Sequence, residues 1–76
     1  MEKFGLFKNK KEIGRFSTVA NRGEEGFLDE FYAILTSLLP ISGDETIRNK
    51  VWSHVNEDFD FDSGEDHYAV RHYERI

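Results

Sequence analysis

The run EEGFLDEFYAILTSLL, residues 24–39, most limits what this chain can fold into. At about 100° per residue, its large apolar side chains fall on one wide face of a helix and its polar side chains on the other. Glu24 and Glu25 stand in the first turn, where the helix dipole favours acids. Pro40 forces the residue before it out of helical geometry. The sequence therefore predicts an amphipathic helix over 24–39 with one buried face.

A second helix is predicted from about residue 43 to residue 56. The tetrapeptide SGDE, residues 42–45, is typical of a capping box, in which Ser42 accepts from a free backbone N–H and Glu45 returns to the Ser42 amide. The predicted apolar stripe of this helix comprises Ile47, Val51, Trp52 and Val55.

Five aromatic residues are assigned to the core: Phe27, Phe31, Trp52, Phe59 and Phe61. An exposed Trp52 would instead be a candidate hot spot for binding another protein.

The stretch NEDFDFDSGED, residues 56–66, contains six acidic residues among eleven and no basic one. Phe59 and Phe61 alternate with aspartates, which is the period of a strand. The segment SGED supplies turn residues, and HYAVRHYERI continues with β-forming residues. The sequence therefore predicts a C-terminal hairpin with residues 63–66 as its loop.

The register of this hairpin follows from its side chains. The predicted pairs are Asp62 with His67, Phe61 with Tyr68, Asp60 with Ala69, Phe59 with Val70 and Asp58 with Arg71. This register sets apolar opposite apolar and acid opposite base. A shorter Ser-Gly loop would oppose Asp62 to Glu65 and Phe61 to Asp66, which is unfavourable.

Two further strands are predicted near the N-terminus, over KFGLF (residues 3–7) and EIGRFSTVA (residues 12–20), with KNKK between them as a turn. The predicted fold class is α+β, with two helices packed on a small antiparallel sheet. Its order is an N-terminal strand or hairpin, a helix, a second helix and a C-terminal hairpin. At 76 residues, we expect a single small domain over residues 1–76.

Composition argues against several function classes. The chain has no cysteine, which excludes disulfides, thiolate metal sites and cysteine nucleophiles. No serine stands in a GxSxG elbow, and no Gly-rich phosphate loop is present. The three histidines lack the paired spacing of a metal site. We therefore expect no enzymatic activity, no catalytic residues, no metal site and no cofactor.

Calcium is the metal that requires separate treatment. Asp58, Asp60 and Asp62 match the first three ligand positions of an EF-hand loop. The match then fails, because Ser63 stands where the loop needs glycine and Ala69 where it needs a bidentate glutamate. Calcium or small-ligand binding at DFDFDSGED is therefore an alternative to the main hypothesis.

No apolar run approaches the roughly 20 residues that a membrane span needs. The N-terminus MEKFGLFKNKK has charges inside its first apolar patch and lacks the continuous apolar core of a signal peptide. The sequence therefore predicts a cytoplasmic protein that does not bind membranes.

Charge is distributed unevenly along the chain. Residues 1–23 hold six basic residues against two acidic ones, whereas residues 24–70 hold two against twelve, within a net charge of −5. An acidic body repels nucleic acid and favours a basic partner. We therefore expect no direct nucleic-acid binding and a partner protein with a basic surface.

In size, acidity and lack of cysteine, and in NEDFDFDSGED, the chain resembles the small acidic proteins with which phages inhibit host enzymes, including anti-restriction and anti-CRISPR proteins. This resemblance implies an inhibitor or regulator that occupies a basic surface of a larger protein. The expected mechanism is steric or electrostatic occupation of that surface. A nucleic-acid-binding enzyme is one class of partner that fits it, and mimicry of nucleic acid is one form that the mechanism can take.

The predicted partner-binding residues are Asp58, Asp60, Asp62, Glu65 and Asp66, on the hairpin edge and its loop. Tyr73 is a further candidate anchor, because residues 67–76 are expected to form an edge strand that recruits a partner strand. The remaining alternative is a homo-oligomeric structural module, in which edge strands of two copies pair with each other.

Overall fold

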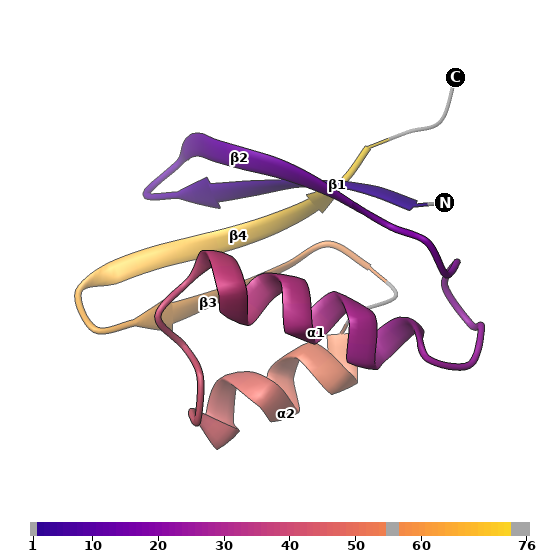
Figure 1. Ribbon diagram of the computed structural model, residues 1–76. Coiled ribbons are helices and arrows are strands. Elements are labelled where there is room, and N and C mark those ends of the chain that lie inside the picture. Colours follow the sequence, from indigo (N-terminus) through magenta and orange to yellow (C-terminus); the bar gives the residue numbers. More distant parts are fainter. Residues whose placement is uncertain (1, 55–56, 74–76) are drawn as a thin grey trace.

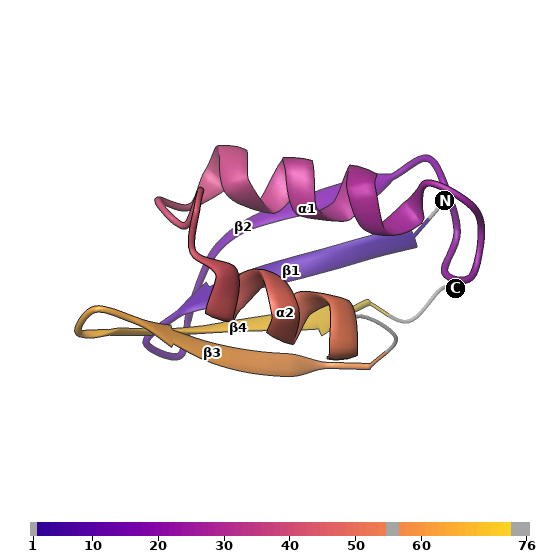
Figure 2. The same ribbon diagram turned by 90° about the horizontal axis from the view of Figure 1, so that it is seen from below.

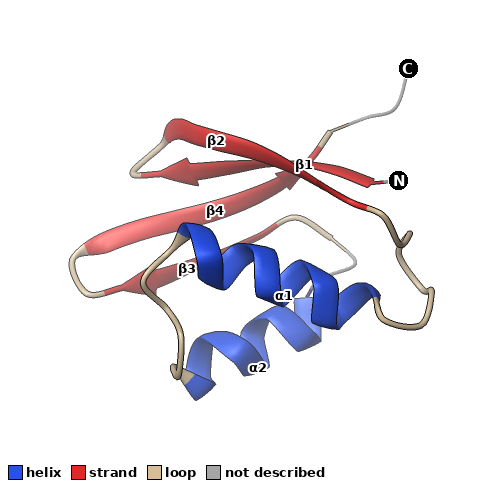
Figure 3. Ribbon diagram, viewed as in Figure 1, coloured by secondary structure: helices blue, strands red, loops and turns tan. Residues whose placement is uncertain are grey.

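The computed structural model describes residues 2–54 and 57–73 of the chain. Within these ranges the chain forms two helices and four strands, and Figures 1 and 3 show how they are arranged. Their order is β1 (Glu2–Lys8), β2 (Lys11–Thr18), α1 (Phe27–Leu38), α2 (Glu45–His54), β3 (Phe59–Ser63) and β4 (Asp66–His72). The predicted α+β class is confirmed, and the N-terminal segment forms a hairpin rather than a single strand.

The four strands form one antiparallel sheet in the order β2-β1-β4-β3. The prediction that residues 67–76 form an edge strand is wrong, because β4 pairs with β1 on one side and with β3 on the other. The inner strands differ from the outer ones in having three consecutive buried residues at their centres, so these central residues are buried on both faces of the sheet. These residues are Phe4, Gly5 and Leu6 in β1 and Tyr68, Ala69 and Val70 in β4. The edges of the sheet are β2 and β3.

The register of the β3–β4 hairpin agrees with the prediction at four pairs, from Asp62↔His67 to Phe59↔Val70. The ladder also includes Ser63↔Asp66, which shortens the loop to Gly64 and Glu65. Gly64 has a φ of 64°, which is typical of the first central position of a type II′ hairpin turn. The fifth predicted pair, Asp58 with Arg71, is not part of the ladder, because β3 begins at Phe59.

The β1–β2 hairpin turns at Asn9 and Lys10, whose φ angles of 50° and 73° are typical of a type I′ turn. Asn9 also joins this turn to the start of β4. Its backbone N–H donates to the His67 carbonyl at 2.7 Å, and its side-chain oxygen accepts from the His67 N–H at 2.9 Å. The two hairpins are therefore fixed side by side at this end of the sheet.

Both helices lie on the same face of the sheet, as Figure 2 shows. Helix α1 packs against β2, and α2 packs against β3. Phe31 of α1 is fully buried and lies among the rings of Phe4, Phe16, Phe27 and Phe59. The core is therefore an aromatic cluster between the helices and one face of the sheet.

The predicted core assignments are confirmed for Phe27, Phe31, Phe59 and Phe61, all of which are buried. Trp52 is only partly buried. Its ring packs edge-on against Tyr32 at 5.5 Å, and the Arg48 guanidinium lies 4.4 Å from its centroid. These three side chains form a small aromatic patch on the helical side of the molecule.

The helix ends differ from the prediction in two ways. Helix α1 begins at Phe27 rather than residue 24, because Gly26 at the N-cap has a φ of 86° and ends the preceding turn. The prediction of a capping box at Ser42 and Glu45 is wrong, because Asp44 accepts the backbone N–H of Ile47 at 3.2 Å instead. Asp44 is the residue immediately before α2, so its carboxylate lies closer to the free amides than the Ser42 hydroxyl does. The predicted last residues of this helix, 55 and 56, lie outside the described ranges.

Candidate functional site

The face of the sheet opposite the helices carries two of the predicted acids, and we call it the open face. No helix covers this face in the described part of the chain. Directly opposed residues of adjacent antiparallel strands share a face, so the pairs Asp62↔His67, Asp60↔Ala69, Phe7↔Ala69 and Gly5↔Arg71 identify its side chains. Two of the predicted acids, Asp60 and Asp62, therefore lie on the open face.

These two aspartates belong to a network with β4. The Oδ1 atom of Asp60 lies 3.1 Å from Nη1 of Arg71, and its Oδ2 atom lies 3.1 Å from Nε2 of His67. The other ring nitrogen of His67 lies 2.7 Å from Oδ1 of Asp62. One histidine thus bridges two carboxylates, and Arg71 holds one of them from the other side.

The network changes the acidity of its members. The hydrogen bonds from Arg71 and then His67 lower the pKa of Asp60. The contacts with Asp62 and then Asp60 raise the pKa of His67. Both shifts favour the charged forms, so Asp60 is an anion whose charge is largely balanced by its neighbours.

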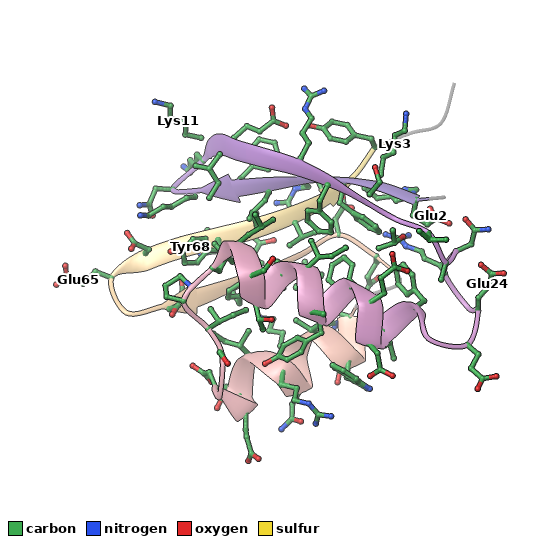
Figure 4. All side chains as sticks on the ribbon, viewed as in Figure 1. Glu2, Lys3, Lys11, Glu24, Glu65 and Tyr68 are labelled. Atoms are coloured by element: carbon green, nitrogen blue, oxygen red, sulfur yellow. The ribbon has the colours of Figure 1, made fainter. Side chains whose placement is uncertain are left out.

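The other predicted acids are placed differently. Asp58 accepts the backbone N–H of His72 at 2.9 Å and so holds the far end of β4. Asp66 accepts from the Asn9 side chain at 3.1 Å and lies 3.7 Å from Nζ of Lys8. Glu65 projects from the tip of the β3–β4 hairpin, as Figure 4 shows. Asp58 and Asp66 therefore have structural partners, whereas Glu65 is exposed.

Tyr73 lies away from the acids of the hairpin tip, at the opposite end of β4. Its ring packs beneath the Arg15 guanidinium, 4.6 Å from the ring centroid, and its hydroxyl donates to Glu12. The side chain is partly buried. The structure therefore does not bring Tyr73 together with Asp62 and Glu65 in one patch.

The sequence did not reveal a hollow on the open face. Its volume is about 290 Å³, and it is lined by Phe7, Lys10, Asp60, His67, Ala69 and Arg71. In the segment HYAVR, Ala69 stands two positions from both His67 and Arg71, so the three share a face of a strand. A small residue between two long ones was the sequence signal for a hollow. Phe7 and Lys10 come from the other hairpin, so the predicted elements alone gave no reason to place them there.

A second polar pair missed by sequence reasoning joins Glu2 and His72. Nε2 of His72 lies 2.5 Å from Oε1 of Glu2, which is only 6% exposed. The other oxygen of Glu2 accepts the backbone N–H of Arg22 at 3.4 Å. The pair links the start of β1 to the end of β4 and to the loop before α1. Its role is therefore structural.

The three aspartates of the EF-hand-like match are bonded along the β3–β4 hairpin. Asp58, Asp60 and Asp62 each bond to a group of β4. Over residues 2–54 and 57–73, no group of three or more His, Asp or Glu side chains is arranged to hold a metal ion. Among the helices described, none is long and apolar enough to cross a membrane.

Comparison of the chain with protein-family models, with curated proteins and with solved structures gave no match in any of the three.

Proposed function

We propose that this chain is a non-catalytic binding protein that docks onto a basic segment of a larger protein and thereby inhibits or regulates it. The observation that carries the proposal is the edge strand β3. The segment 57–65 contains five carboxylates and no basic side chain, and β3 pairs with another strand on one side only.

An edge strand presents backbone N–H and C=O groups that an extended segment can pair with. Acidic side chains on such an edge discourage pairing with another acidic edge, and the same charges favour a basic strand. The edge of β3 is therefore selective: it discriminates between partners by their charge.

The exposed carboxylates make the contacts in this proposal. The Asp62 side chain is 77% exposed, and its Oδ2 atom bonds to no described residue. Glu57, with a side chain 73% exposed, and Glu65 flank the strand at its two ends. The expected partner segment has Lys or Arg at alternate positions, because alternate residues of an added strand lie beside Asp60 and Asp62.

The balanced charge of Asp60 supports strand addition over imitation of nucleic acid. A nucleic-acid mimic needs a row of uncompensated charges, whereas Arg71 and His67 both bond to Asp60. The net charge of −5 speeds the approach of a basic partner without requiring mimicry.

The test is a pair of matched variants. Glu57→Gln/Asp62→Asn/Glu65→Gln removes three charges from the β3 edge, and Glu25→Gln/Asp29→Asn/Glu45→Gln removes three from the helices and the loop before α1. Each is used to capture partners from the native cell lysate after nuclease treatment, with identification by mass spectrometry and titration of the purified partner by calorimetry. We expect the edge variant to weaken binding of one stoichiometric protein at least about 10-fold and the helical variant to leave it unchanged. Equal binding by both variants, or equal loss in both, contradicts the proposal.

One observation favours a second candidate, self-association. The other edge, β2, is eight residues long and exposes Ile13. It carries Lys11 and Arg15 against Glu12, to which Arg15 bonds, so its net charge is +1 and opposite in sign to that of the β3 edge of a second copy. Light scattering at micromolar concentration distinguishes self-association from docking on another protein. A monomeric mass contradicts self-association and leaves the docking proposal.

A further inference from the structure

The hollow on the open face has a simple cause. Ala69 of β4 is directly opposite Phe7 on one side and Asp60 on the other. His67 and Arg71 stand two positions before and after it and therefore point to the same face. Since alanine ends at Cβ while its four neighbours extend further, the sheet surface is depressed over Ala69.

Arg71 is held in place but keeps donors free. All three of its hydrogen bonds are made by Nη1, to the carbonyls of Phe59 and Val70 and to Oδ1 of Asp60, at 3.1–3.3 Å. Its Nε and Nη2 atoms donate to no group within the described ranges. A fixed guanidinium with free N–H groups is well suited to bind a phosphate or carboxylate.

The rim of the hollow favours an anion. Lys10 at the β1–β2 turn is exposed and forms no ion pair with any residue the structure describes. Asp60 is the only carboxylate in the lining, and both of its oxygens are already bonded, one to Arg71 and one to His67. Asp62 also faces His67, from outside the hollow. The free donors of the site are therefore those of Lys10 and Arg71.

The remaining wall is aromatic. Phe7 is partly exposed and borders the hollow together with the methyl group of Ala69. Aromatic side chains on the exposed face of a sheet are stacking surfaces for planar rings such as nucleobases. The volume of about 290 Å³ is at the small end of ligand pockets, which suits one base and its phosphate rather than a larger molecule.

We propose that the hollow over Ala69 binds a mononucleotide, with its phosphate on Arg71 and Lys10 and its base against Phe7. This site is centred on Ala69 of β4, with Asp60 of β3 on its border, and it requires no partner protein. The inference therefore goes beyond the proposed docking function and does not depend on it.

The proposal is tested by titrating the isotope-labelled protein with AMP, GMP, CMP and UMP, while amide chemical shifts are recorded. Adenosine, guanosine, cytidine, uridine and inorganic phosphate are titrated separately. We expect at least one mononucleotide to shift the amides of Phe7, Ala69 and Arg71. We also expect it to bind about 10-fold or more tightly than its own nucleoside or phosphate alone.

Ala69→Leu fills the hollow, and Ser17→Leu is its control, because Ser17 is exposed at another part of the sheet. We expect Ala69→Leu to lower nucleotide affinity about 10-fold or more and Ser17→Leu to leave it unchanged. Lys10→Gln, an exposed turn substitution, provides a second test if Ala69→Leu does not fold, and is expected to weaken binding several-fold.

Three results overturn the inference. They are the absence of shifts at the hollow with all four nucleotides at about 10 mM, equal affinity for a nucleotide and its nucleoside, and unchanged affinity in Ala69→Leu or Lys10→Gln. Loss of nucleotide binding with partner docking intact, or the reverse, separates this site from the β3 edge.

Discussion

The ring of Tyr73 lies directly across Gly5, so closely that a Cβ at position 5 would come within 2.7 Å of the Tyr73 hydroxyl oxygen. Gly5 is on the inner strand β1, opposite Arg71 of β4 and Arg15 of β2. The missing side chain at position 5 thus provides the space in which Tyr73 reaches Arg15 and Glu12.

We expect Gly5→Ala to destabilise the protein by about 1–3 kcal/mol, because the new methyl group displaces Tyr73. Gly5 is not in the left-handed region, so the backbone itself tolerates alanine. The measurement is urea denaturation of Gly5→Ala, Tyr73→Ala and the double variant. The cost of Gly5→Ala should disappear in the Tyr73→Ala background, and a cost that persists there would show that Tyr73 is not its cause.

Phe31→Ala is expected to cost about 3–5 kcal/mol, because this fully buried ring contacts four other aromatic rings of the core. A domain of this size has a total stability of roughly 4–11 kcal/mol, so the variant should be unfolded in part or in full. Circular dichroism during urea denaturation measures the change.

The matched control for Phe31→Ala is Leu38→Ala, at a position of α1 that is 50% exposed. Its expected effect is within about 0.5 kcal/mol. Similar losses in the two variants would refute the core assignment.

Asp44→Ala is expected to cost about 1 kcal/mol, because it removes the acceptor for the Ile47 amide at the start of α2. Ser42→Ala should have almost no effect, since Ser42 is exposed and precedes the helix by three positions. Thermal denaturation of the two variants compares them directly. A larger decrease in Tm for Ser42→Ala than for Asp44→Ala would show that Ser42, and not Asp44, caps the helix.

The His67 network predicts a dependence of stability on pH. The pKa of His67 is raised above its ordinary value of 6.5, so its stabilising contribution is fully present below pH 6.5 and is lost as the pH rises through the raised value. The difference in Tm between wild type and His67→Gln should therefore shrink as the pH increases from about 5.5 to 9. A difference that stays constant over this range would contradict the assigned contacts.

Asp60 gives the opposite trend. Its pKa is lowered below the ordinary value of 3.8, so its contribution is present above pH 3.8 and is lost as the pH falls through the lowered value. The difference in Tm between wild type and Asp60→Asn should shrink at acid pH. Both effects are expected to be small, because the side chains are about half exposed and screened by solvent.

The β3–β4 register followed from the sequence because the shorter Ser-Gly loop would have placed Phe61 opposite Asp66. The order of the strands did not follow, since hairpin patterns specify pairing within each hairpin and not between them. The triplets FGL and YAV, buried on both faces, were the signal that β1 and β4 are the inner strands. The capping residue of α2 was also ambiguous, because Ser42 and Asp44 are both good helix caps.

The candidate site was predicted only in part, because the sequence pattern of a hairpin does not specify how it pairs with another hairpin. Pairing of acids with bases across β3 and β4 was expected, but Arg71 reaches diagonally to Asp60 rather than to Asp58. The hollow over Ala69 requires Phe7 and Lys10 from the first hairpin to lie beside β4. A property that depends on how two hairpins meet is absent from the pattern of either hairpin alone.

The pairing of β1 with β4 also has a consequence for how the protein is made. Phe4 is opposite His72, so the centre of the sheet joins segments from the two ends of the described chain. On the ribosome, residues 2–8 are synthesised before their partners at 66–72. The rings of Phe16, Phe27 and Phe31, which contact Phe4, also precede β4 in the chain. The four-stranded sheet can be completed only after β4 has emerged, and we expect this distant closure to slow folding.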